Sequence, residues 1–140
     1  MNDERAREAV HVWYSLFNLP HRESVAVIHD RVVTPDYQSC TGDAPGECWD
    51  KARSIQVIGG FAVSIPDMKF EIRERLSIED RVVVRGEVSG TPARDLFGGV
   101  IPHSDKRFRV MAIDIHTMEE GRIRRTYHLE NWFAALQQLR

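Results

Sequence analysis

Apolar residues recur at helical spacing in the first half of the chain. The pattern predicts helices at 3–18, 22–33 and 47–64, separated by a short strand at 37–41. The apolar face of the first helix consists of Ala6, Val10, Trp13 and Phe17, at intervals of four, three and four residues. The face of the third helix consists of Trp49, Ala52, Ile55 and Ile58. We expect Trp13 and Ile55 to share one core with Phe70 of the segment that follows.

From Pro66 onward the period of the pattern changes to two. Four segments alternate between apolar and polar residues, and tight turns are expected at 79–80 and 119–121. These predicted strands are 69–78, 81–89, 107–118 and 122–130. A loop at 91–105 interrupts them, and a short amphipathic helix follows from residue 132 to residue 139. Helices followed by an antiparallel meander predict an α+β fold, with helices packed on one face of a curved sheet.

The predicted strand at 107–118 is apolar on both faces. Met111, Ile113 and Ile115 lie on one face, whereas Asp114 and His116 lie on the other among apolar neighbours. A strand of this kind is usually covered on both sides. We expect helices on the Asp114 side and a second copy of the chain on the Ile113 side. The alternative is that Asp114 and His116 face water.

The next strand extends this polar set. Counting outward from the turn at 119–121 pairs His116 with Thr126 and Asp114 with His128, and roughly Met118 with Arg124. Glu130 shares the face of His128. Two imidazoles and two carboxyls in a mostly apolar cavity are suited to proton transfer near neutral pH, because burial raises a carboxyl pKa and lowers that of an imidazole. Ordinary ion pairing in solvent remains the alternative.

Composition indicates an ordinary single domain that spans residues 1–140. The chain has 140 residues, a formal charge of −2 and 42% hydrophobic residues. The near-neutral charge argues against a nucleic-acid partner. No apolar run is long enough for a transmembrane helix or a secretory signal, so we expect no membrane association and a cytoplasmic location.

The two cysteines, Cys40 and Cys48, are not spaced as zinc ligands. We expect them to be free, partly buried thiols. The histidines also lack a metal-ligand spacing, so no metal site and no cofactor are predicted. No role is assigned to the four histidines expected on helix surfaces or loops, which are His11, His21, His29 and His103.

Six short segments, in their order and spacing, resemble the SnoaL-like polyketide cyclase family of the nuclear transport factor 2-like superfamily, which includes ketosteroid isomerase. They are Ile-Pro-Asp-Met at 65–68, Asp-Arg-Val-Val-Val-Arg at 80–85, Ser-Gly-Thr at 89–91, Ala-Ile-Asp-Ile-His at 112–116, Glu-Gly-Arg-Ile at 120–123 and Leu-Gln-Gln-Leu at 136–139. The resemblance spans about residues 6–139. It implies a strongly bent antiparallel sheet wrapped around N-terminal helices as a cone with an apolar pocket. It also implies dimers and cofactor-free, aldol-type ring closure.

The resemblance assigns roles to several residues. Asp114 matches the aspartate of the family's Ile-Asp strand, which helps to hold an oxyanion in ketosteroid isomerases. His128 stands where cyclases often have a pocket aspartate, and Glu130 is placed to take over the carboxylate role. Cys40 and Pro92 stand where many members have histidines.

The remaining expected pocket residues are substrate-binding. Trp13 or Tyr14 matches a pocket-facing aromatic residue of the family, and Arg85 matches an arginine that would anchor a substrate carboxyl. His116 and Thr126 are expected to line the pocket.

Three functions remain open for such a domain. The first is an enzyme of the cyclase, isomerase or dehydratase type that acts on a small lipophilic carbonyl compound, with His128 as base, Glu130 as its support and Asp114 as acid. The second is a non-catalytic module that binds an apolar metabolite in the same pocket. The third is a dimerisation domain. A hydrogen bond between His128 and Glu130 inside a closed pocket would favour the enzyme.

Overall fold

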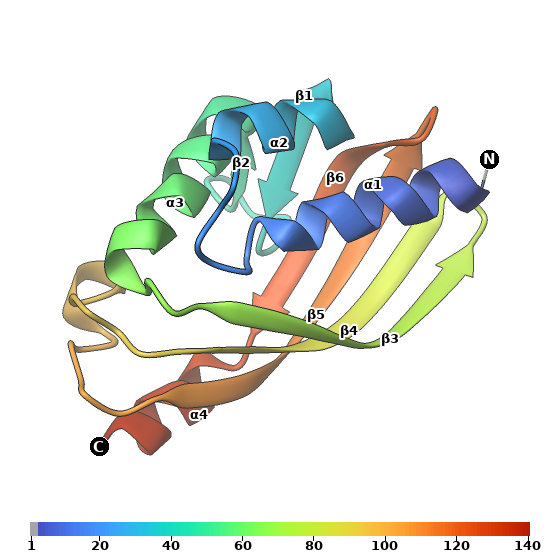
Figure 1. Ribbon diagram of the computed structural model, residues 1–140. Helices are drawn as coiled ribbons and strands as arrows, with labels where there is room; N and C mark the ends of the chain where they lie inside the picture. Colours follow the sequence, from blue (N-terminus) through green and yellow to red (C-terminus); the bar gives the residue numbers. More distant parts are fainter. Residues whose placement is uncertain (1–2) are drawn as a thin grey trace.

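A strongly curved, unclosed sheet of six strands forms the framework of the protein (Figure 1). The computed structural model describes residues 3–140. The strands are β1 (Val33–Cys40), β2 (Cys48–Asp50), β3 (Lys69–Ile78), β4 (Arg81–Gly90), β5 (Phe108–Glu119) and β6 (Arg122–Glu130). Their order across the sheet is β2-β1-β6-β5-β4-β3. All neighbours are antiparallel except β1 and β6, which run parallel. The sheet is therefore mixed, whereas an antiparallel sheet was expected.

Three helices lie over one face of this sheet, in the order α1 (Asp3–Ser15), α2 (Val25–Val32) and α3 (Lys51–Ser64) (Figure 1). A short 3₁₀ turn, Phe97–Gly99, interrupts the loop between β4 and β5. The fourth helix, α4 (Trp132–Leu139), packs against β5 at the end of the chain. This arrangement confirms the predicted α+β class. Within residues 3–140, every helix is too short or too polar to span a lipid bilayer.

The β5–β6 hairpin has almost the predicted register. Asp114 pairs with His128 and His116 pairs with Thr126, as expected from the turn. Met118, however, pairs with Ile123 because β6 carries a bulge between its second and fourth residues. The extra residue turns Ile123 to the buried side, which strict alternation had assigned to the opposite face. The turn itself has positive φ at both central positions, 120 and 121, and glycine occupies the second.

The segment that precedes α3 differs from the prediction. Cys48–Asp50 is a strand, so the helix begins at Lys51 rather than at residue 47. The Asp50 side chain caps it by accepting a hydrogen bond from the Arg53 backbone N–H at 2.9 Å. Because β2 pairs antiparallel with β1, Cys48 lies opposite Cys40, and the two form a disulfide bond. The expectation of free thiols is therefore wrong.

The core lies between the three N-terminal helices and the sheet. Trp13 and Phe70 belong to it as predicted, but α3 contributes Ile58 rather than Ile55, which is only half-buried. Ala52 is exposed, since α3 is rotated so that Ser54 and Ile58 face inward. The Phe70 ring packs directly on Gly86 of β4, where a Cβ atom would come within 2.3 Å of the ring. Glycine thus allows the close approach of this ring to the sheet.

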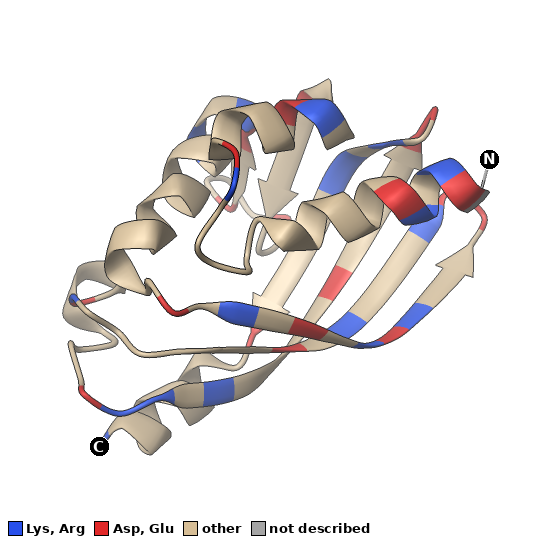
Figure 2. Ribbon diagram, viewed as in Figure 1, with Lys and Arg blue, Asp and Glu red and all other residues tan. Residues whose placement is uncertain are grey.

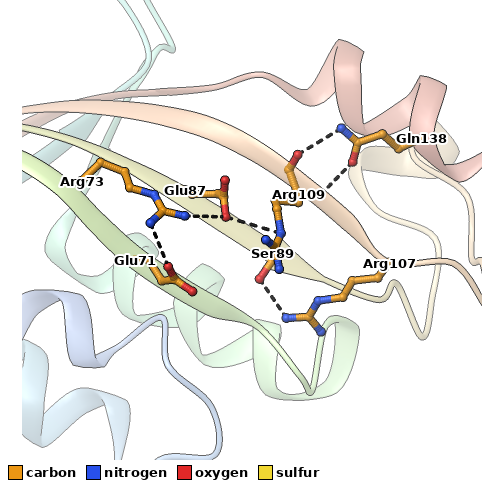
Figure 3. A network of polar contacts seen from close by, with 7 residues as sticks. All are labelled: Glu71, Arg73, Glu87, Ser89, Arg107, Arg109 and Gln138. Atoms are coloured by element: carbon orange, nitrogen blue, oxygen red, sulfur yellow. Dashed lines mark hydrogen bonds and ion pairs between the residues drawn. The ribbon is translucent and has the colours of Figure 1, made fainter.

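Charged residues of both signs are interspersed along β3 and β4 (Figure 2). Arg73 bonds to Glu71 and Glu87, and Glu87 also contacts Arg109 at 3.4 Å (Figure 3). Exposed pairs of this kind contribute little to stability. The Gln138 side chain instead bonds to both the N–H and the C=O of Arg109, which fixes α4 on β5.

Truncation of Phe70 to Ala should lower the free energy of unfolding by about 3–5 kcal/mol, because the ring is buried between α1 and the sheet. Ile55→Ala should cost less, since Ile55 lies at the edge of the core. Chemical denaturation measures both changes. A loss below about 1 kcal/mol for Phe70→Ala would contradict the inward orientation of β3 at this residue.

Candidate active site

A cavity of about 110 Å³ lies between the helices and the concave face of the sheet. Its walls are mainly aromatic and aliphatic. The aromatic residues come from several elements: Trp13 from α1, Phe61 from α3, Phe70 from β3 and Trp132 from α4. An engineered apolar cavity of roughly 150 Å³ holds one benzene ring, so the space suits a compact apolar group. Small-molecule sites have this character of apolar walls with a few polar groups.

Polar side chains from β5 and β6 interrupt the apolar wall. Asp114, Thr126, His128 and Glu130 all line the cavity, as does Trp13. The alternation of the two strands explains this convergence, because Asp114 and His128 are directly paired and Glu130 follows on the same face. The outward residues Met111, Ile113 and Ile115 lie on the opposite face and are exposed. The sequence left open whether Asp114 faces the cavity or water, and in the structure it faces the cavity.

Asp114 is only 6% exposed, and the Tyr14 hydroxyl donates a hydrogen bond to its Oδ2 at 2.5 Å. Burial raises the pKa of Asp114 to about 7. The charge of Glu130 acts in the same direction, whereas the Tyr14 hydrogen bond and the charge of His128 oppose it. Burial, together with the Asp114 charge, also raises the pKa of Tyr14, so this phenol stays protonated. Near neutral pH, Asp114 therefore exists in both protonation states.

His116 lies behind Asp114 and is fully buried. Its Nε2 lies 2.8 Å from the Tyr14 hydroxyl, and its Nδ1 lies 2.8 Å from Thr126 Oγ1. Burial lowers the pKa of His116 to about 3, so the ring is neutral. When Tyr14 donates to ionised Asp114, Nε2–H donates to the Tyr14 oxygen, and Nδ1 accepts from Thr126. When Asp114 is protonated on Oδ1, its Oδ2 still accepts from Tyr14, so the rest of this chain keeps its direction.

A second polar pair adjoins this chain. His128 Nδ1 lies 2.9 Å from Glu130 Oε2, and Trp132 Nε1 donates to Glu130 Oε1 at 3.2 Å. Burial lowers the pKa of His128, but the hydrogen bond and charge of Glu130, together with the charge of Asp114, raise it overall. With Nδ1–H directed at Glu130, Nε2 is the nitrogen left to accept a proton. The arrangement is that of a base oriented by a carboxylate.

Four of the expected substrate-binding residues do not line the cavity. Tyr14 and His116 lie behind Asp114 and reach the cavity only through it. Cys40 is held in the disulfide, away from the cavity. Arg85 lies on the outer face of β4, where it pairs with Glu74 at 2.5 Å, so it is not placed to anchor a substrate in this cavity.

Several lining residues escaped the sequence-based prediction. Trp132 was assigned to an amphipathic tail, yet it reaches the cavity and holds Glu130. Trp49, predicted on a helix, lies on β2 with its ring 6.3 Å from that of His128. Ser39 and Ser54 also line the cavity. The sequence could have indicated the two tryptophans as lining residues, because a large aromatic residue next to a predicted polar site often covers that site. Nothing in the sequence indicated the two serines.

His29 is also not where the sequence suggested. It was expected on a helix surface, but it is fully buried, and its Nε2 lies 2.9 Å from Ser54 Oγ. Burial lowers its pKa to about 4, and the charge of Lys51 adds to the effect. Among residues 3–140, no group of three potential metal ligands from His, Cys, Asp and Glu is present.

The fold and the cavity define an α+β protein of the nuclear transport factor 2-like type with an apolar pocket. Residues 14–139 match the model of the SnoaL-like polyketide cyclase family, so the chain belongs to that family. No curated protein sequence matches the chain significantly.

Solved structures share the fold at low sequence identity. TsrD from Streptomyces laurentii has a TM-score of 0.83 at 20% identity, with 99% of this chain and 97% of that chain covered. IdmH from Streptomyces antibioticus has a TM-score of 0.78 at 21% identity, with 96% and 97% covered. A SnoaL-like polyketide cyclase from Agrobacterium tumefaciens has a TM-score of 0.77 at 16% identity, with 96% and 98% covered.

Replacement of His29 by Gln should reduce the dependence of stability on pH. The folded state keeps His29 neutral down to about pH 4, whereas the unfolded chain binds a proton below about pH 6.5, so acid destabilises the fold within this window. The wild type should lose about 2 kcal/mol more than His29→Gln between these pH values. Urea denaturation at several pH values measures the difference. His11→Gln, at an exposed residue, is the control and should behave as the wild type.

Proposed function

We propose that this protein is an acid–base enzyme of the cyclase or isomerase type, acting on a small lipophilic carbonyl compound. The observation that carries the proposal is the 2.9 Å contact of His128 with Glu130 beside the buried Asp114 carboxyl, in one apolar cavity. Family membership supports the general class. The chemistry is proton abstraction next to a carbonyl, which needs a base and a hydrogen-bond donor for the enolate oxygen.

His128 is the base in this mechanism. Glu130 accepts a hydrogen bond from Nδ1–H and stabilises the imidazolium that forms when Nε2 takes a proton from the substrate carbon. Trp132 holds the other carboxylate oxygen, so the carboxylate stays aligned with the ring. The raised pKa of His128 brings it toward the working range of a general base near neutral pH.

Protonated Asp114 is the acid. It lines the cavity, and as a neutral carboxyl it donates a hydrogen bond to the carbonyl oxygen as negative charge develops there. Tyr14 and His116 act as positioning residues, because they touch Asp114 or each other rather than the cavity. The neutral state of His116 removes a positive charge that would otherwise favour ionised Asp114.

The binding module is the competing function. The same apolar walls would hold a metabolite without turning it over. The contact between His128 and Glu130 favours the enzyme, since a site that only binds an apolar ligand gains nothing from a buried base supported by a carboxylate.

The outer face of the sheet favours a homodimer. Met111, Ile113, Ile115 and Leu129 are between 39% and 66% exposed, although all four are apolar. They line a shallow groove on this face. A second copy would cover the four residues, which we name the outer patch, and remove them from water.

Carbon-bound proton exchange tests the enzyme without knowledge of the natural substrate. The wild type should accelerate deuterium exchange at the α-carbon of 2-tetralone in D₂O, measured by NMR. His128→Ala should lower the rate by roughly 10²–10³-fold, and Asp114→Asn should retain part of it because the amide still donates. The control is His103→Ala, at an exposed loop residue. Binding of the ketone with exchange at the buffer rate would favour the binding module.

The rate should have a bell-shaped pH dependence. It falls on the acidic side because protonated His128 is no longer a base, and on the alkaline side because Asp114, with a pKa of about 7, loses its proton. Asp114→Asn should remove the alkaline limb and leave the acidic one. An unchanged alkaline limb in this variant would contradict the role of Asp114.

Sedimentation equilibrium at micromolar concentration should give a mass of about 32 kDa, twice the 16.1 kDa of the chain. Ile113→Arg should shift the equilibrium to the monomer, because it places a charge in the centre of the outer patch. Arg124→Ala, away from this patch, is the control. A stable, soluble wild-type monomer would contradict the dimer.

A further inference from the structure

A second group of hydroxyls lies in the cavity wall, on elements other than β5. Ser39 of β1, Ser54 of α3 and Thr126 of β6 all line the cavity. Ser39 and Thr126 are neighbours in the sheet register, which brings two of these side chains together. We call these three residues the hydroxyl cluster. The proton-transfer mechanism uses none of their hydroxyls directly.

Tyr37 supports this cluster from behind. It is 1% exposed, and its hydroxyl makes no hydrogen bond of good geometry within residues 3–140. Burial raises the pKa of Tyr37, and the hydroxyls of Thr126, Ser39 and Ser54, which lie near hydrogen-bonding distance of it, oppose this rise. A buried hydroxyl without a partner is unfavourable, and such groups usually bond to a ligand or an ordered water.

His29 fixes one member of the cluster. Its Nε2 lies 2.9 Å from Ser54 Oγ, and its ring packs edge-on against Tyr37 at 5.3 Å between centroids. The Nδ1 atom of His29 is the other buried polar atom without a partner in the described chain. Both of these buried side-chain atoms thus belong to residues that border the hydroxyl cluster.

We propose that the hydroxyl cluster and Tyr37 form a second polar subsite, which binds a hydroxyl or carbonyl oxygen of the ligand. This inference deepens the proposed function and rests on it for the position of the reacting carbonyl at Asp114. The substrate class is then a compact ketone that carries another oxygen function. Ser39 and Ser54 contact that oxygen, and only in the ligand-bound state does the Tyr37 hydroxyl complete the hydrogen bonds of the serine hydroxyls.

The two polar regions of the cavity are connected through Thr126. Its hydroxyl bonds to His116 Nδ1, and His116 contacts Tyr14, which holds Asp114. A ligand with two oxygen atoms would therefore be oriented at both ends of one continuous network. A ligand with one oxygen has no preference for the hydroxyl cluster and leaves it unused.

Paired ketone probes test the subsite. Acetophenone has one oxygen, and its three ring-hydroxylated isomers carry a second at different distances. We expect at least one isomer to bind the wild type roughly fivefold more tightly than acetophenone, the gain of one ordinary hydrogen bond. Three tryptophans line the cavity, namely Trp13, Trp49 and Trp132. Their indole N–H resonances report the dissociation constants in an NMR titration.

Tyr37→Phe and Ser54→Ala should each abolish this preference, so that within each variant the best isomer binds no more tightly than acetophenone. Tyr127→Phe is the matched control, because its hydroxyl bonds to Asp43 outside the cavity, and it should keep the preference. The proposal is wrong if no isomer binds better than acetophenone, if none binds, or if the preference survives in either variant.

Thermal unfolding separates this role from a structural one. Tyr37→Phe removes a hydroxyl that makes no well-formed hydrogen bond in the ligand-free protein, so the melting temperature without ligand should not fall. A fall of more than about 4 °C would mean that the hydroxyl is bonded within the fold, and would overturn the proposal. Binding is measured without turnover. A negative result in the 2-tetralone exchange therefore contradicts the enzyme but not the subsite. Loss of the probe preference contradicts the subsite but not the enzyme.

Discussion

The hydrogen bond from the Tyr14 hydroxyl to Asp114 joins the first helix to the centre of the sheet. A carboxyl group that is 6% exposed is tolerated in this core only because it has such a partner and is partly neutral. For this bond to form, α1 must place the Tyr14 hydroxyl within hydrogen-bonding distance of Asp114 on β5. Phe70 stacks against Tyr14 with ring centroids 4.5 Å apart and keeps the phenol in place. The position of α1, and with it one wall of the cavity, follows from this contact.

The register of β5 and β6 provides the rest of the site. Residues of matching alternation lie on one face, so the choice of Asp114 as an inward residue brings His128 and Glu130 to the same cavity. The bulge in β6 lies before Thr126, so it leaves the pairing of the polar residues intact and turns Ile123 into the core. His116 is buried in the same row. Its ring is neutral and adds no positive charge beside Asp114, whose pKa is raised by burial.

Local pattern was enough to predict the four long strands and the pairing of Asp114 with His128, because these depend on alternation and on a tight turn close in sequence. It left open whether the face that carries both residues is buried or exposed. It was not enough for contacts between distant elements. The partnership of Tyr14 with Asp114 spans 100 residues, and that of His29 with Ser54 requires α3 to be rotated away from the predicted Ile55 face. The strand β2 was missed because three residues carry no measurable alternation, and the pairing of the cysteines was missed with it.

The cavity is shaped by elements that look peripheral in the sequence. The disulfide holds β2 against β1, and Asp50 then starts α3 at the next residue. Trp49, between Cys48 and Asp50, is consequently fixed beside His128. At the opposite end of the chain, Gln138 fixes α4, whose first residue, Trp132, holds Glu130. His128 and Glu130 are therefore constrained from both sides by residues of short elements, which explains how a rigid polar pair persists in an otherwise apolar pocket.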